Sequence, residues 1–385
     1  GAFLTGDLFN LFVFYEVLLL ASYGLLLHGG GRDRTRAGLH YVVVNLAGST
    51  LFLFAVGTLY GVLGTLNMAD LSVRVAEAAP ENAALVRTAG LLLFVVFALK
   101  AALVPLYLWL PRAYAHTSAP VAALFAVMTK LGAYSILRVH TLIFGPEAGV
   151  AANLWAPWLL PLALGTIVLG TLGAMASRTL RLQAAYLVVV SAGTVLTAVG
   201  IGGADGLGGG LYYLAHSTFA GAALFLLADM LVRERGEAGD RLVPAPAAAR
   251  ARLLGAFFVV TAMGIAGMPP LSGFLGKFLV LRAAVDGPLT AWVLGVVLVT
   301  GVLGVVLLAR SGNVIFYRAR PPGTAGIRVA TPNAALVPLA GLLALGVALM
   351  LLAGPAFDYA HSTGAQLLAP ETYVRAVLGP AGEAR

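Results

Sequence analysis

Residues 91–110 read LLLFVVFALKAALVPLYLWL, twenty residues with a single charge, Lys100, and a single proline, Pro105. An apolar run of this length can cross the hydrocarbon core of a bilayer, which is about 30 Å thick. Lys100 lies about 13 Å from Trp109 along a helix, farther than its side chain can reach. Pro105 removes a backbone hydrogen bond and breaks or kinks a helix. The stretch therefore predicts a broken membrane helix that carries a buried lysine.

The rest of the chain has the composition of a membrane protein. Its 385 residues are 60% hydrophobic and only 10% charged, with a mean hydropathy of +0.94, which is too apolar for an ordinary soluble domain. Apolar stretches near spanning length occur at 4–27, 39–63, 88–110, 118–143, 156–176, 184–202, 210–232, 253–284, 289–309 and 335–353. The pattern predicts an all-α, polytopic membrane protein with about ten transmembrane helices.

One of these stretches, 253–284, is unusually long and contains Pro269 and Pro270 between several glycines. We interpret it as a second broken helix. Irregular backbone inside a membrane is tolerated where its freed polar groups line a protein cavity. In transporters, such breaks mark the sites where substrates and ions bind.

Arginines are concentrated in alternate connections between the predicted spans. Fifteen of the 21 arginines fall on one side and six on the other. Because cytoplasmic loops are enriched in basic residues, the richer side is predicted to be cytoplasmic and both chain ends external. The net charge of +8 follows from these loops. No basic run exceeds a few residues, so nucleic acid is not an expected partner.

Other site classes find little support in the sequence. The chain has no cysteine, which excludes disulfides and thiolate-bound zinc or iron–sulfur centres, and we expect no metal or cofactor. The glycines at 206–210 lack the spacing of a phosphate-binding loop and are expected in a short outer loop. Since the chain has no initiator methionine and no signal-peptide pattern, we expect it to be incomplete at its N-terminus.

The three lysines of the chain, Lys100, Lys130 and Lys277, all lie inside long apolar segments. Burying an ionisable group in a bilayer costs a few kcal/mol or more, and such groups usually serve ion or proton movement. A desolvated lysine can release its proton, whereas arginine keeps it. Glu16, in the first span, is the natural countercharge, unless it forms a purely structural ion pair. His216 could relay protons near neutral pH or could simply be a packing residue.

Several motifs resemble a known family. The segment 6–17, GDLFNLFVFYEV, and the segment 64–71, GTLNMADL, are similar to the D subunit of Mrp cation/proton antiporters. The proline-containing segments PLYLWLP at 105–111 and GMPPLSGFLGK at 267–277, with APVAALF at 119–125, are shared with the proton-pumping membrane subunits of respiratory complex I and of membrane-bound hydrogenases. Together these motifs extend over most of the chain.

The resemblance implies a fourteen-helix fold with two inverted five-helix repeats, each with a broken helix. The ten predicted spans would be its fifth to fourteenth helices. The first repeat, incomplete at its N-terminus, would then occupy residues 1–143 and the second residues 144–311. A cytoplasmic loop, the last transmembrane helix and an external C-terminal tail would make up residues 312–385.

The resemblance also implies functional roles. Glu16 and Lys100 match the glutamate–lysine pair of the family, and Lys130 matches its central lysine. His216 matches the histidine between the repeats, and Lys277 the ionisable residue of the second broken helix. Many relatives carry a further lysine four or five residues after the histidine, where this chain has Ala220 and Gly221.

The expected function is that of a proton-translocating subunit of a multisubunit Na⁺/H⁺ antiporter, a transporter rather than an enzyme. Its expected partners are the other antiporter subunits, protons, Na⁺ or another monovalent cation, and the lipid of a bacterial cell membrane. Two alternatives remain open. One is a proton-pumping subunit of a complex I-like or hydrogenase assembly, and the other is a scaffold that transports nothing.

Overall fold

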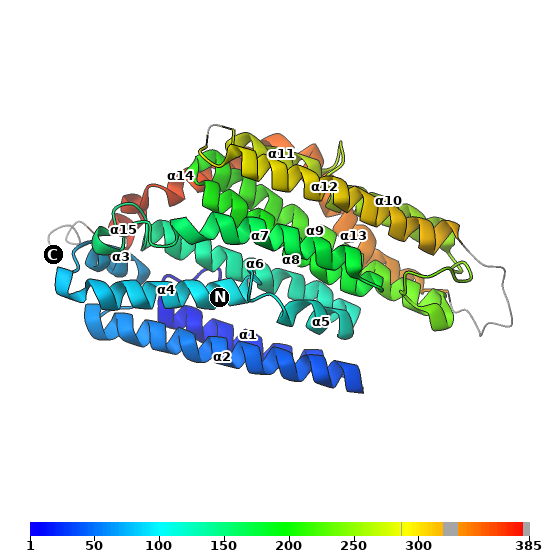
Figure 1. The fold of residues 1–385 in the computed structure, drawn as a ribbon, viewed down its shortest axis with the longest axis horizontal. Helices are drawn as coiled ribbons and strands as arrows, with labels where there is room; N and C mark the ends of the chain where they lie inside the picture. The colour runs from blue at the N-terminus through cyan, green and yellow to red at the C-terminus, as the bar shows by residue number, and fades with distance from the viewer. Residues whose placement is uncertain (286, 319–329, 380–385) are drawn as a thin grey trace.

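The computed structural model describes residues 1–285, 287–318 and 330–379, and the regular elements of these residues are helices (Figure 1). The α-helices are α1 (Leu8–Leu27), α2 (Arg32–Leu63), α3 (Met68–Ala76), α4 (Ala83–Lys100), α5 (Trp109–His116), α6 (Ala119–Leu142), α7 (Ala156–Ala176), α8 (Leu180–Ile201), α9 (Gly203–Glu234), α10 (Ala251–Ala266), α11 (Ser272–Ala283), α12 (Thr290–Gly312), α13 (Asn333–Leu351), α14 (Ala353–Leu367) and α15 (Pro370–Leu378).

Nine helices within the described residues are long and apolar enough to cross a membrane, namely α1, α2, α4, α6, α7, α8, α9, α12 and α13. The tenth predicted span, 253–284, is divided between α10, of 16 residues, and α11, of 12 residues. Nine complete spans and one divided span agree with the ten predicted from hydropathy.

The long helices run side by side, with α1 and α2 at one edge and α10, α11 and α12 at the opposite edge (Figure 1). Helix α8 is the most buried of the nine long helices, since 72% of an 18-residue apolar stretch within it is buried. Helix α9 packs against many of the other helices, with contacts to α6, α8, α10, α11, α13 and α14. Functional side chains on α8 and α9 are therefore shielded from lipid.

The break predicted at Pro105 is confirmed, because α4 ends before this residue and α5 begins after it. The backbone groups that the break releases find side-chain partners. The N–H of Val104 donates to the Thr166 hydroxyl of α7 at 2.9 Å. The indole N–H of Trp109 donates to the carbonyl of Leu99 at 3.1 Å. These bonds remove the cost of leaving buried backbone groups without partners.

The second break, predicted around Pro269 and Pro270, is also confirmed. Helix α10 ends at Ala266, and the capping residue that follows, Gly267, has a φ of +80°. Glycine adopts this left-handed conformation without the steric cost that a side chain adds. The chain then passes both prolines before α11 begins at Ser272.

At the end of the bundle where α3 lies, two of the family-like motifs are joined by backbone hydrogen bonds. The N–H of Leu8 donates to the carbonyl of Leu66, and the N–H of Met68 donates to the carbonyl of Gly6. The Asp7 side chain caps α1 by accepting from the N–H of Asn10 at 2.8 Å. These contacts fix where α1 begins and so set the depth of its later residues.

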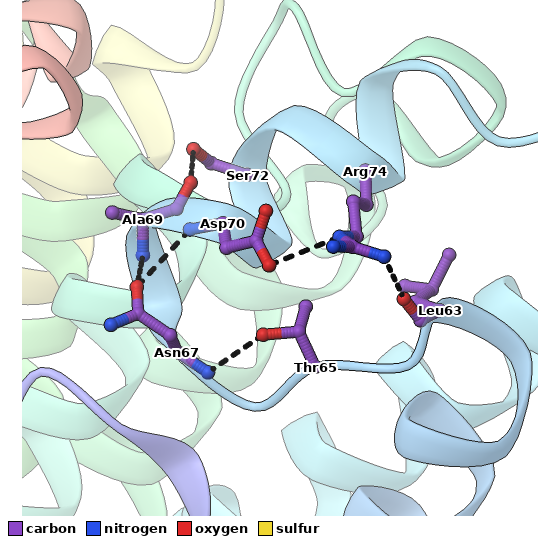
Figure 2. A network of polar contacts seen from close by, with 7 residues as sticks. All are labelled: Leu63, Thr65, Asn67, Ala69, Asp70, Ser72 and Arg74. Atoms are coloured by element: carbon purple, nitrogen blue, oxygen red, sulfur yellow. Dashed lines mark hydrogen bonds and ion pairs between the residues drawn. The ribbon is translucent and has the colours of Figure 1, made fainter. Parts of the chain in front are cut away.

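Figure 2 shows how the second of these motifs is held. The side-chain oxygen of Asn67 caps α3 by accepting from the N–H groups of Ala69 and Asp70. The guanidinium of Arg74 bridges the Asp70 carboxylate and the carbonyl of Leu63. Side-chain capping of this kind typically contributes about 1 kcal/mol. The motif GTLNMADL is thus a turn and helix start that anchors α1 to α3.

One feature differs from the expectations. The glycines at 206–210 lie inside α9 and not in an outer loop. A Cβ atom at Gly208 would meet the backbone of His361 on α14, and one at Gly209 would meet Leu279 on α11. These glycines therefore serve close helix packing. The predicted C-terminal tail contains α14 and α15, whereas residues 319–329 and 380–385 of the predicted segment 312–385 lie outside the described residues.

Candidate functional site

Lys100 is the last residue of α4 and is 5% exposed. Its Nζ donates to the side-chain oxygen of Asn45 on α2 at 3.3 Å and lies 5.7 Å from the centre of the Tyr15 ring on α1. The carbonyl end of a helix favours a cation through the aligned peptide dipoles. The first break thus places a lysine where the helix end, an amide oxygen and an aromatic face can all stabilise its charge.

Glu16 follows Tyr15 on α1 and is half-buried, and its buried Oε1 has no hydrogen-bond partner in the described part of the chain. Within the described residues no lysine nitrogen forms an ion pair with a carboxylate within 4.0 Å. Glu16 is nevertheless near enough to act electrostatically on Lys100. The direct acceptor for Lys100 is Asn45, so the functional pairing of Glu16 with Lys100 stays a prediction.

Lys130 lies in the middle of α6 and is 1% exposed. Its Nζ donates to the hydroxyl of Ser191 on α8 at 2.5 Å. Ser191 in turn donates to the carbonyl of Val188 at 2.7 Å. Two residues after the lysine, a Cβ atom at Gly132 would collide with the backbone at Ala101. Helix α6 therefore packs directly against the first break and presents its lysine to a neutral hydroxyl.

A cavity of about 40 Å³ is lined in part by Ser191, the hydrogen-bond partner of Lys130. A buried water molecule needs roughly 10–15 Å³ of cavity volume, so the cavity can hold a few water molecules. Its polar lining comes from α7, α8, α9, α11 and α12 and comprises Thr171, Ser191, Tyr213, His216, Ser217, Lys277 and Thr300. The cavity therefore joins the Lys130–Ser191 contact to His216 and Lys277.

His216 is 4% exposed and projects from α9 toward the second break. Its Nδ1 lies 2.8 Å from the hydroxyl of Ser272, and its Nε2 lies 3.1 Å from the carbonyl of Gly264. A Cβ atom at Gly273 would meet both the Gly264 carbonyl and the histidine ring. The break thus supplies the partners of the histidine and leaves room for its ring.

Lys277 uses the same helix end. Its Nζ donates to the carbonyls of Ile265 at 3.2 Å and Ala266 at 2.9 Å, the last two residues of α10. Hydrogen bonds from a cation to such free carbonyls are favoured by the helix dipole. Both breaks therefore place a lysine beside the carbonyl end of a helix. Lys100 lies at the end of its own helix, α4, whereas Lys277 of α11 lies beside the end of α10.

The structure brings three of the five predicted residues to one place. His216 and Lys277 line the central cavity, and Lys130 reaches it through Ser191. Lys100 and Glu16 are not part of its lining. No group of three or more histidine, aspartate or glutamate side chains that could hold a metal occurs in the described residues.

Three polar partners were not predicted from the sequence, namely Asn45, Ser191 and Ser272. Asn45 offered a signal, because an amide within the apolar span 39–63 is unusual. Ser272 stands in the proline-rich motif of the second break, but its role depends on the path of the backbone. Serines such as Ser191 occur throughout apolar helices, so sequence alone gives no reason to single it out.

Comparison with known proteins identifies the family. A family model described as "NADH:quinone oxidoreductase/Mrp antiporter, TM" matches residues 5–304. The chain belongs to this family. It is therefore a multi-pass membrane protein of a family whose description names both Mrp antiporters and NADH:quinone oxidoreductase.

Individual relatives agree with this assignment. The chain is 41% identical to the D subunit of a probable K⁺/H⁺ antiporter of Rhizobium meliloti, with 98% of this chain and 75% of the relative covered. It is 37% identical to the D subunit of the Na⁺/H⁺ antiporter of Alkalihalophilus pseudofirmus with the same coverage. Its fold is similar to a chain in the Mrp complex of a Dietzia species, with a TM-score of 0.82, 30% identity, and coverage of 98% and 77%.

Proposed function

We propose that this chain is a proton-translocating subunit of a multisubunit monovalent cation/proton antiporter in the bacterial cell membrane. It acts as a transporter component and not as an enzyme. Protons enter at a broken helix and pass along the four residues Lys100, Lys130, His216 and Lys277. Glu16 sets the charge of Lys100 and so gates the first step.

The observation that carries this proposal is the environment of Lys130. A lysine in the middle of a spanning helix, 1% exposed and bonded only to a neutral hydroxyl among the described residues, is costly to keep charged. Ser191 connects it to a cavity that His216 and Lys277 also line. Groups that can each hold and release a proton around space for water are what a proton relay requires.

We further propose the orientation and division of the chain. Its arginine-rich loops face the cytoplasm, as the distribution of basic residues favours, and both ends of this chain lie outside. Residues 1–143 and 144–311 act as two repeats with one broken helix each. The transported cation is Na⁺ or K⁺, since one relative is named as a K⁺/H⁺ antiporter subunit and the other as a Na⁺/H⁺ antiporter subunit.

A second candidate comes from the family, whose description also names NADH:quinone oxidoreductase. The same line of buried groups could move protons in a redox-driven complex. The D subunit of cation/proton antiporters is favoured because relatives with that name match 98% of this chain. A scaffold without transport would use the buried charges only to hold helices together.

The test is cation/proton exchange by the whole complex in inverted vesicles that carry a pH gradient. Addition of Na⁺ or K⁺ should dissipate the gradient with the native chain, and Lys130→Ala should abolish this response while the complex still assembles. Thr197→Val is the matched control, because within the described residues its buried hydroxyl bonds only to the Gly193 carbonyl of its own helix. Near-normal exchange by an assembled Lys130→Ala complex would refute the relay.

A further inference from the structure

Beside His216, the hydroxyl hydrogen of Ser272 has two possible acceptors. Both ring nitrogens face oxygen atoms, Nδ1 the hydroxyl of Ser272 at 2.8 Å and Nε2 the carbonyl of Gly264 at 3.1 Å. The Ser272 hydroxyl also lies 3.1 Å from the carbonyl of Gly346 on α13. His216 and Ser272 are 4% and 2% exposed, so bulk water cannot freely replace these bonds.

Donor and acceptor chemistry limits the arrangements. A carbonyl only accepts hydrogen bonds, so Nε2 must carry a hydrogen to bond to Gly264. The other neutral tautomer would point a nitrogen lone pair at that carbonyl. Ser272 has a single hydroxyl hydrogen, which can go either to Nδ1 of His216 or to the carbonyl of Gly346.

The charge on His216 decides between these two partners. When the ring is neutral, Nδ1 is an acceptor and takes the Ser272 hydrogen, so the Gly346 carbonyl loses its bond from Ser272 and keeps only the bond within α13. When the ring is charged, Nδ1 is a donor to the Ser272 oxygen, and the hydroxyl hydrogen turns to Gly346. Only the charged ring allows all three bonds at once.

We propose that Ser272 is a positioning residue that couples the proton on His216 to the contact between the second helix break and α13. Protonation of His216 closes the bond from Ser272 to Gly346 and holds α13 against the break. Loss of the proton opens that bond. This inference rests on the proposed function, because it requires His216 to take up and release a proton during transport.

The other groups that face the histidine come from α6, α9, α10, α11 and α13. The charged groups that act on it are Lys277 on α11 and Lys130 on α6, and the Tyr213 ring on α9 lies 5.8 Å from its ring. Helices α10 and α13 contribute one polar side chain, Thr261, to the small cavity on the other side of the ring. That cavity measures about 30 Å³ and has room for a water molecule at the released carbonyl.

The test is the pH profile of cation/proton exchange by the complex with Ser272→Ala. Without the hydroxyl, the charged ring has an unpartnered N–H, which is more costly than the unpartnered neutral nitrogen of the uncharged ring. The profile should therefore move to lower pH by about one unit. Ser272→Thr keeps the hydroxyl and should restore the native profile. Ser177→Ala, whose hydroxyl donates to the Gly173 carbonyl of its own helix, should leave the profile unchanged.

An unchanged profile in Ser272→Ala would overturn the coupling, and so would an equal loss of exchange at every pH without a shift. If Ser272→Ala does not assemble, Ser272→Cys provides a weak donor of similar size and should show the acid shift. The ¹⁵N signals of labelled histidine, assigned with His216→Gln, give a second readout. In Ser272→Ala the neutral ring should persist to lower pH than in the native chain.

Comparison with Lys130→Ala separates the two proposals. If Lys130→Ala exchanges normally, the proposed function fails. If Lys130→Ala is inactive and Ser272→Ala keeps the native profile and the native histidine titration, the relay stands and only the coupling through Ser272 fails.

Discussion

Each of the three lysines in this chain, of which Lys277 is only partly buried, has a neutral oxygen as its hydrogen-bond partner. Lys100 bonds to the amide of Asn45, Lys130 to the hydroxyl of Ser191, and Lys277 to two backbone carbonyls. A carboxylate in contact would stabilise the ammonium strongly and hold its proton. A neutral acceptor satisfies the ammonium but leaves the lysine free to change charge. This choice of partners suits a relay better than it suits structural ion pairs.

Asn45 tests this view for the first lysine. Asn45→Ala removes the amide oxygen that accepts from Lys100, and bonds to charged groups contribute about 1.5–3 kcal/mol. We expect exchange by the assembled complex to fall about ten-fold or more. Thr50→Ala is the control on the same helix, because its exposed hydroxyl bonds only to the Leu46 carbonyl among the residues that the structure describes. Equal activity of the two variants would show that Asn45 has no part in proton transfer.

Sequence chemistry alone singled out the lysines, whose part in proton transfer stays a prediction. The rarity of lysine and its confinement to apolar segments indicated Lys100, Lys130 and Lys277 before any fold was known. Their partners were not predictable, because Asn45 and Ser191 come from helices that sequence patterns cannot pair. The same limit applied to Glu16, which was expected as a countercharge but makes no direct ion pair with Lys100 in the described residues.

Among the helices, the two breaks are the elements that organise the site. Prolines removed backbone hydrogen bonds at both, which made the breaks predictable from sequence. Their environment required the fold, because the freed groups bond to residues distant in sequence, such as Thr166 for the N–H of Val104. The position of the glycines at 206–210 also could not be predicted without the fold. Glycine is typical of loops, yet here it allows α9 to pack closely on α11 and α14.

Gly273 tests the packing of the second break. A Cβ atom there would overlap the carbonyl of Gly264 and press on the His216 ring. Overpacking of this kind typically costs about 1–3 kcal/mol, so Gly273→Ala should lower the thermal stability of the assembled complex and its exchange activity. Gly341→Ala, on α13 with nothing within 4 Å of the added atom, should preserve both. Native stability of Gly273→Ala would contradict the close packing described for the break.

For the whole molecule, the connections predicted to face the cytoplasm are tied together. The Glu234 carboxylate, 0% exposed, accepts from the N–H groups of Arg250 at 2.8 Å and Thr331 at 2.9 Å. It thereby links the end of α9 to the starts of α10 and α13. Nearby, Asp229 forms ion pairs with Arg181 and Arg233. The described ends of these connections therefore lie together, as a shared side of the membrane requires.

The absence of cysteine from the chain makes this orientation directly measurable. Single cysteines at Glu237, on the arginine-rich side, and at Glu81, on the opposite side, both replace exposed residues. In intact cells a membrane-impermeant maleimide should label Glu81→Cys and spare Glu237→Cys, and in inverted vesicles the pattern should reverse. Labelling of both positions from the same side would refute the proposed topology.

The central claim is that the buried lysines move protons, and Lys130→Arg tests it most directly. Arginine keeps the positive charge at this position but cannot release its proton in a protein. We predict that the complex with Lys130→Arg assembles and shows no cation-dependent dissipation of a pH gradient in inverted vesicles, as with Lys130→Ala. Exchange by Lys130→Arg at close to the native rate would contradict the relay and would indicate that the charge at Lys130 serves only to hold the helices together.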